Sequence, residues 1–135
     1  MNLRVVPTAV HGAIDHAVAP TLIAAPEIFR LGKASPEGLV AEVTGGMGAI
    51  YSNLTDYEFS LKNVIPMPWH LALDAVSGVA LAVVPHVTGA RRRGILHWLP
   101  HTAIGAMEVA LALTTKTRPP RTKPGRVARV LRLAM

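Results

Sequence analysis

The feature that most constrains this chain is an internal duplication. Residues 7–26 read PTAVHGAIDHAVAPTLIAAP, and residues 66–85 read PMPWHLALDAVSGVALAVVP. At a constant offset (70 − 11 = 59 and 85 − 26 = 59), both copies begin with proline, continue with His-x-x-x-Asp and close an apolar run with proline. A weaker match follows each copy and pairs Gly46 with Gly105, Glu42 with His101 and Thr55 with Thr114. The chain is therefore expected to fold as two similar units.

The amino-acid composition indicates that these units lie in a membrane. Half of the residues are apolar and only 16% are charged, whereas a soluble domain carries about 25% charged residues. Four apolar stretches, at about 5–29, 38–55, 65–87 and 95–115, are separated by short connections. Each is long enough to cross a bilayer, which takes roughly 17–25 residues.

The expected fold is an all-α membrane protein. Residues 1–115 are predicted to form a bundle of four transmembrane helices, arranged as two tandem helical hairpins with pseudo-two-fold symmetry. Repeat 1 covers about residues 7–58 and repeat 2 about residues 66–115. Small residues in the second and fourth helices favour close helix packing in a membrane.

Basic residues lie outside the apolar stretches. Nine of them fall on the side of the termini and five on the other side, which favours an inner-membrane protein with both termini in the cytoplasm. Residues 116–135 form a basic C-terminal tail, either an amphipathic helix on an anionic leaflet or a simple positive-inside tail. The lipid bilayer is the expected partner. Nucleic acid is not, because the basic residues have no aromatic neighbours for base stacking.

Ionisable groups inside the apolar stretches mark the candidate site, because such groups usually face the interior of a bundle. His11 and Asp15 are four residues apart and share a helix face, and His70 and Asp74 repeat that arrangement. Depth along the helices predicts two polar layers. The layer near the termini comprises His11, Asp15, Asn53, His70, Asp74 and Glu108. The layer near the loops comprises Glu27, Glu42, His86, His97 and His101.

Several interpretations remain open for the layer near the termini. Each His–Asp pair can simply hydrogen-bond between helices. The groups can also bind one octahedral divalent metal, with His11, Asp15, His70 and Asp74 as ligands and Glu108 as a further ligand or base. A third interpretation is haem b held between His11 and His70. A fourth is a proton or ion path that uses both layers.

The motifs HGAIDH followed by AAPEIF, and WHLALD followed by VVPHVTG, give residues 7–115 a family likeness. The chain resembles small bacterial membrane proteins of the SPW-repeat type, in which a two-helix unit with a Ser-Pro-Trp turn occurs twice. Here the turns read Ala-Pro-Glu and Val-Pro-His. The resemblance implies a four-helix integral membrane protein and no known reaction.

Motifs of common enzymes are absent from the sequence, including the nucleophile elbow, the zinc-protease helix and the glycine-rich nucleotide loops. The absence of cysteine excludes disulfides, zinc thiolates and iron–sulfur clusters. We therefore expect a non-enzymatic accessory or structural subunit, working with other membrane proteins or as a homo-oligomer. Haem or metal binding is a second hypothesis, and proton or ion translocation is a third.

Overall fold

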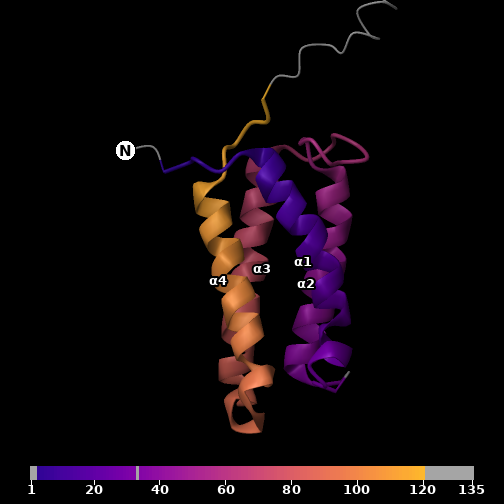
Figure 1. The fold of residues 1–135 in the computed structure, drawn as a ribbon, viewed down its shortest axis with the longest axis vertical. Coiled ribbons are helices and arrows are strands. Elements are labelled where there is room, and N and C mark those ends of the chain that lie inside the picture. The colour runs from indigo at the N-terminus through magenta and orange to yellow at the C-terminus, as the bar shows by residue number, and fades with distance from the viewer. Residues whose placement is uncertain (1–2, 33, 121–135) are drawn as a thin grey trace, which may run out of the picture.

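The computed structural model describes residues 3–32 and 34–120, which form a bundle of helices lying side by side (Figure 1). Its elements are α1 (Thr8–Ile28), α2 (Pro36–Leu54), α3 (Met67–Val87), the short 3-10 helices η1 (Ala90–Arg93) and η2 (Ile95–His97), and α4 (Leu99–Thr114). α1 packs mainly on α2 and α3 mainly on α4, and α2 and α3 join the two pairs. The predicted all-α bundle of two hairpins is confirmed. Most of the tail predicted at 116–135 lies outside the described residues.

Proline and serine set the helix boundaries. Pro7 and Pro66 precede α1 and α3 in extended conformation, and Ser35 caps α2 by accepting a hydrogen bond from the Gly38 N–H. Pro100 is the second residue of α4, where a missing N–H costs nothing. The chain from Ile95 to His97 forms η2.

Two short backbone straps connect the hairpins. Val6, just before α1, pairs with Thr115, just after α4, and Ile65, just before α3, pairs with Thr55, just after α2. Each strap carries two backbone hydrogen bonds of 2.8–3.0 Å. The straps bring the end of one hairpin beside the start of the other, and this arrangement supports the site described below.

The pairings within the straps show which residues of the two repeat units correspond. The first helices of the two units correspond at an offset of 59 (65 − 6 = 59), but the second helices correspond at 60 (115 − 55 = 60). Thr55 therefore matches Thr115 and not Thr114. Between the matched positions of its two helices, the second unit therefore holds one residue more than the first, and an alignment at one constant offset misses this shift.

Gly45 and Gly105, which correspond at the offset of 60, allow close packing within each hairpin. A Cβ at Gly45 would lie 2.8 Å from the Ala19 carbonyl oxygen on α1, and a Cβ at Gly105 would lie 2.7 Å from the Ala82 nitrogen on α3. Gly46, by contrast, has nothing within 4 Å of its added Cβ. The glycines at 45 and 105 let the paired backbones touch, as small residues do in closely packed helix pairs.

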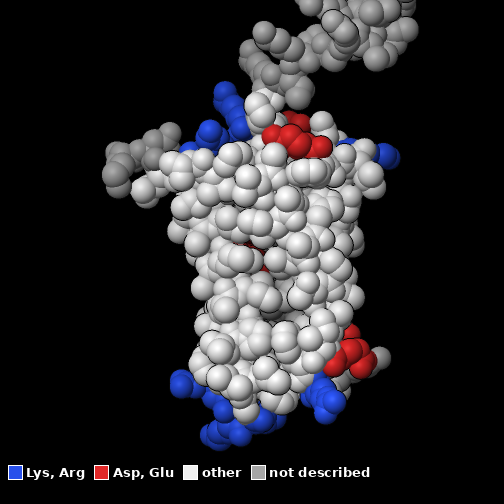
Figure 2. Space-filling model, viewed as in Figure 1, with Lys and Arg blue, Asp and Glu red and all other residues white. Residues whose placement is uncertain are grey.

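The surface of the bundle is apolar in its middle and charged at its ends. Figure 2 shows Lys and Arg gathered at both ends of one face, with a broad band without Lys or Arg between them. None of the four helices contains Lys or Arg. Large apolar side chains are exposed on all four helices, for example Val10 on α1, Val43 on α2, Val76 on α3 and Leu113 on α4.

By length and composition, one helix among the described residues, α3, can cross a membrane. The sequence predicted four such helices. α4 has 16 residues, which span roughly 24 Å at 1.5 Å per residue, whereas the hydrocarbon core is about 30 Å thick. A core helix of a soluble protein can meet the same criteria as α3.

Candidate metal centre

Two histidines and two aspartates meet where α1 and α3 begin. His11 and Asp15 lie on the first turns of α1, and His70 and Asp74 lie on the first turns of α3. One ligand atom from each of the four side chains lies within 4.8 Å of the others. Both imidazoles are at most 1% exposed. The facing His-x-x-x-Asp pairs predicted from the repeat are therefore present.

The two imidazole rings point their Nε2 atoms at a common centre. These two atoms lie 3.2 Å apart. Oδ2 of Asp74 lies 2.8 Å from His11 Nε2 and 3.1 Å from His70 Nε2. The Asp15 carboxylate is placed less tightly, with Oδ1 at 3.4 Å from His11 Nε2 and Oδ2 at 3.0 Å from His70 Nε2. Four strong potential ligand atoms therefore surround one point inside the bundle.

Threonines on the straps orient both rings. Nδ1 of His11 lies 2.8 Å from the Thr115 hydroxyl, and Nδ1 of His70 lies 2.8 Å from the Thr55 hydroxyl. The Thr55 hydroxyl donates its proton to the Tyr51 carbonyl, 2.7 Å away. Because that hydroxyl can then only accept from the ring, we assign the Nδ1–H tautomer to His70. Its Nε2 lone pair then faces the centre of the cluster.

Tyrosines approach the two carboxylates from outside the cluster. The Tyr51 hydroxyl donates to Asp74 Oδ1 at 2.7 Å, whereas the Tyr57 hydroxyl reaches Asp15 Oδ2 only at 3.5 Å. Burial raises the pKa of Tyr57, so its hydroxyl keeps its proton at neutral pH. The ring of Tyr57 lies against Gly12, where any side chain would collide with it. Because the hydrogen bond from Tyr51 is much shorter than the one from Tyr57, Asp74 is held more firmly than Asp15.

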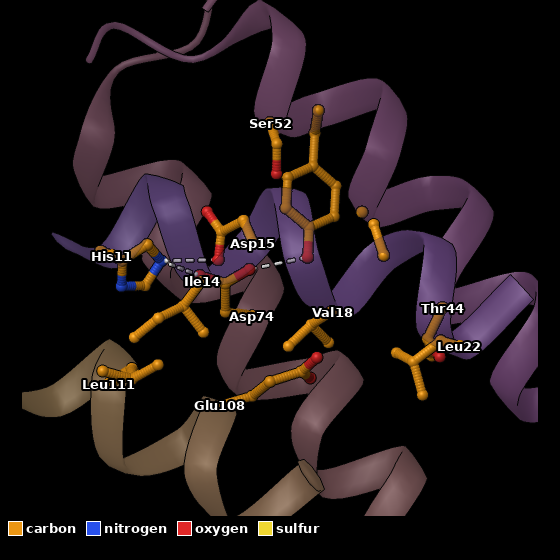
Figure 3. Close-up of a pocket in the computed structure, with 13 residues that line it drawn as sticks. His11, Ile14, Asp15, Val18, Leu22, Thr44, Ser52, Asp74, Glu108 and Leu111 are labelled. Atoms are coloured by element: carbon orange, nitrogen blue, oxygen red, sulfur yellow. Dashed lines mark hydrogen bonds and ion pairs between the residues drawn. The ribbon is translucent and has the colours of Figure 1, made fainter. Parts of the chain in front are cut away.

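Glu108 lies beside the cluster and not within the group of four. It extends from α4 into a small cavity that His11, Asp15 and Asp74 also line (Figure 3). Its carboxylate accepts a hydrogen bond of 3.3 Å from Ser77. Asn53, predicted for the same layer, donates instead to the carbonyl of Ala49.

A second polar cluster lies at the loop end of the bundle around Glu37, a residue that the sequence pattern did not single out. Glu37, which is 0% exposed, accepts hydrogen bonds from Arg93 at 2.6 and 3.1 Å and bonds with His97 Nδ1 at 2.7 Å. His101 Nε2 contacts the Glu37 carbonyl at 3.0 Å. Of the predicted loop-side layer, His97 and His101 thus come together, while His86 bonds with Thr102. This cluster joins α2 to the η1–η2 segment and to α4.

An apolar core separates the two polar clusters. Leu22, Ala25, Ala41 and Leu81 form a buried apolar group. Leu22 and Leu81 each lie seven residues beyond the aspartate of their own helix (22 − 15 = 7 and 81 − 74 = 7), which is about 10 Å along the axis. The His and Asp cluster is therefore a local site near one end of the bundle.

A comparison with protein-family models found no matching family, and comparisons with characterised proteins and with solved structures found no significant match. The inferences about function therefore depend on the residues and contacts of this chain.

Proposed function

We propose that this protein binds one divalent transition-metal ion, with zinc as the best fit, through His11, Asp15, His70 and Asp74. The observation that carries the proposal is the convergence of two imidazole nitrogens and two carboxylates on one buried point. Imidazole and carboxylate together suit zinc and the neighbouring first-row divalent ions.

The distances support an ion of this size. Zinc binds His nitrogen at about 2.0–2.1 Å and carboxylate oxygen at about 2.0–2.2 Å. By simple geometry, adjacent ligand atoms are then about 3.3 Å apart in a tetrahedral site and about 3.0 Å apart in an octahedral one. The five separations between the four side chains that involve an imidazole nitrogen run from 2.8 to 3.4 Å. One ion can therefore bond both imidazoles and Asp74 with little rearrangement, whereas Asp15, whose two oxygens face different rings, has to turn one oxygen toward the ion.

The charges and tautomers also favour a cation. His70 uses its Nδ1–H for Thr55, so its Nε2 has no proton to offer unless the ring is charged. Two charged rings would bring two N–H groups together, with Nε2 atoms 3.2 Å apart. A divalent ion with two neutral imidazoles and two carboxylates gives a cluster of zero net charge. Such a cluster has a smaller desolvation cost inside a protein than an unbalanced one.

The geometry gives less support to haem binding and to ion translocation. With metal–nitrogen bonds of about 2 Å, two axial histidines of one haem iron would have nitrogens roughly 4 Å apart with a porphyrin between them. Here the nitrogens are 3.2 Å apart, and Asp74 contacts both of them. A route for ions through the bundle would have to cross the apolar core around Leu22 and Leu81.

We further propose that the bundle is embedded in a membrane. The exposed apolar side chains on all four helices, the absence of Lys and Arg from those helices, and the charged ends support this location (Figure 2). On this proposal, the metal ties α1 to α3 and so joins the two symmetry-related hairpins. The accessory role, the resemblance to SPW-repeat proteins and the cytoplasmic termini stay predictions.

The membrane location is tested by fractionation. After expression in bacteria, the protein is expected in the membrane pellet, resistant to alkaline carbonate and released by mild detergent. Recovery in the aqueous fraction without detergent would contradict the membrane proposal and leave the metal proposal intact.

The threonines that orient the imidazoles provide a test of the metal proposal. Replacing Thr115 with valine removes the hydroxyl beside His11 Nδ1, and we expect zinc affinity to fall about 10–100-fold, as is typical for outer-shell partners of metal ligands. The neighbouring Thr114→Val variant is the matched control, because the exposed Thr114 hydroxyl bonds only to the Ala110 carbonyl. Competition with a chromogenic chelator measures both affinities. Equal affinities in the two variants would contradict the orienting role of Thr115.

A further inference from the structure

A small polar cavity lies directly beside the proposed metal ligands. Its volume is about 20 Å³, and its lining includes His11, Asp15, Asp74, Ser52 and Glu108. Figure 3 shows the labelled side chains surrounding this space, with Glu108 approaching from the side opposite Ser52. A cavity of this size holds about one water molecule, provided that polar partners line it.

The polar groups that line the cavity from α2 and α4 are not duplicated in the two repeat units. At the offset of 60 between α2 and α4, Ser52 corresponds to Ala112, and Gly48 corresponds to Glu108. The ligands themselves are duplicated, but neither of these two polar groups has a polar counterpart in the other unit. A purely structural ion would need no such asymmetry, because its four protein ligands already match in pairs.

Two of the lining groups have hydrogen-bonding capacity to spare. The Ser52 hydroxyl is buried; it interacts with the Tyr57 hydroxyl but meets the full geometric criteria for a hydrogen bond with none of the described residues. The Glu108 carboxylate has one contact of 3.3 Å, from Ser77. Buried polar groups are almost always fully paired, so a hydroxyl that lines a cavity and keeps spare hydrogen-bonding capacity can bind a small polar molecule there.

Asp15, which lines this cavity, is the most loosely held of the four proposed ligands. The Asp15 side chain is 14% exposed, against 6% for Asp74, and of its contacts only that to His70 is short, at 3.0 Å, while those to His11 and Tyr57 are 3.4 and 3.5 Å long. An apolar groove on the outer surface shares Ile14 and Val18 with the cavity. Figure 2 shows an acidic side chain at the bottom of a recess halfway along the same face as α1 and α4. The cavity therefore lies close to the outside of the bundle.

We infer that the bound metal keeps an exchangeable coordination position that opens onto this cavity. Water fills the position at rest, and Ser52 and Glu108 hydrogen-bond to it. A small anion can replace this water at the metal, so the ion is accessible to small ligands and not only structural. This inference rests on the proposed metal site.

Cobalt substitution tests the inference with the full chain in detergent. The visible absorption of bound Co²⁺ reports its coordination, so titration with azide should change the spectrum of the wild-type protein. Gly48→Ala is the informative variant, because its added Cβ lies 3.9 Å from both Tyr51 Oη and Ala19 Cβ and fills the cavity without a clash. We expect it to bind cobalt with unchanged stoichiometry and azide at least tenfold more weakly.

Gly46→Ala is the matched control, since it makes the same substitution two residues away in open space. It should bind azide as the wild type does. A wild-type cobalt spectrum that ignores azide, or equal azide affinity in Gly48→Ala and Gly46→Ala, would overturn the inference while leaving metal binding in place. Failure of the wild type to bind cobalt or zinc would instead contradict the proposed function itself.

Discussion

The His11→Ala protein is expected to lose its zinc site. The variant removes one of the four proposed ligands and the contact that His11 makes with the Thr115 hydroxyl. Loss of an outer-shell partner typically costs 10–100-fold in metal affinity, so loss of a ligand should cost more than about 100-fold. The thermal stabilisation by zinc should disappear as well. For the wild type, that stabilisation is about 2.7 kcal/mol when free zinc is 100 times its Kd.

His16→Ala is the control for this prediction. His16 is exposed on the same helix and bonds its Nδ1 to the Gly12 carbonyl, outside the group of four. It should bind zinc like the wild type and show the same zinc-dependent rise in Tm. If His11→Ala retained full zinc affinity, or if both variants lost affinity equally, the assignment of His11 as a ligand would be wrong.

The Gly45→Ala protein is expected to be clearly less stable than the wild type. The new methyl group would lie 2.8 Å from both the Ala19 carbonyl oxygen and the Leu22 Cβ, and 2.9 Å from the Ile23 nitrogen, so α1 and α2 must move apart. Overpacking of this kind typically lowers the free energy of unfolding by about 1–3 kcal/mol. Thermal unfolding in detergent measures the change.

The neighbouring Gly46→Ala variant separates crowding from helix propensity. Its methyl group meets nothing within 4 Å, and alanine favours a helix over glycine by about 0.8–1 kcal/mol. This variant should therefore be slightly more stable than the wild type. A Gly45→Ala protein that was also stabilised would show that the helices do not touch at this position.

The sequence was sufficient to predict a bundle of four helices and the meeting of the two His–Asp pairs, although it predicted four membrane-crossing helices and only α3 meets those criteria among the described residues. Two copies of His-x-x-x-Asp at matching depths in parallel units can hardly avoid facing each other once the units pack, and His11 and His70 do meet. Glu108 was placed at the correct level, since it lines the adjoining cavity. Its distance from the centre depends on how far α4 lies from α1 and α3, and helix periodicity carries no information about that distance.

The supporting residues were harder to predict because they depend on the loops. Thr115, and not Thr114, contacts His11 because the offset between the units rises by one residue between their first and second helices, whereas a constant offset points to Thr114. Glu37 looked like a loop residue beside Pro36. In the structure, Glu37 lies in the first turn of α2. It is buried there and accepts a hydrogen bond from Arg93, which comes from the other hairpin. Its position after Ser35 and Pro36 is typical of a helix start and could have revealed it.

The most direct test of the central claim is X-ray absorption spectroscopy at the zinc edge of the protein purified in detergent with one equivalent of zinc. We expect a first shell of nitrogen and oxygen at about 2.0–2.1 Å, with outer-shell scattering from two imidazole rings that is reduced in the His11→Ala protein. Failure to retain zinc, or a shell of oxygen alone without imidazole scattering, would contradict a metal centre formed by His11, Asp15, His70 and Asp74.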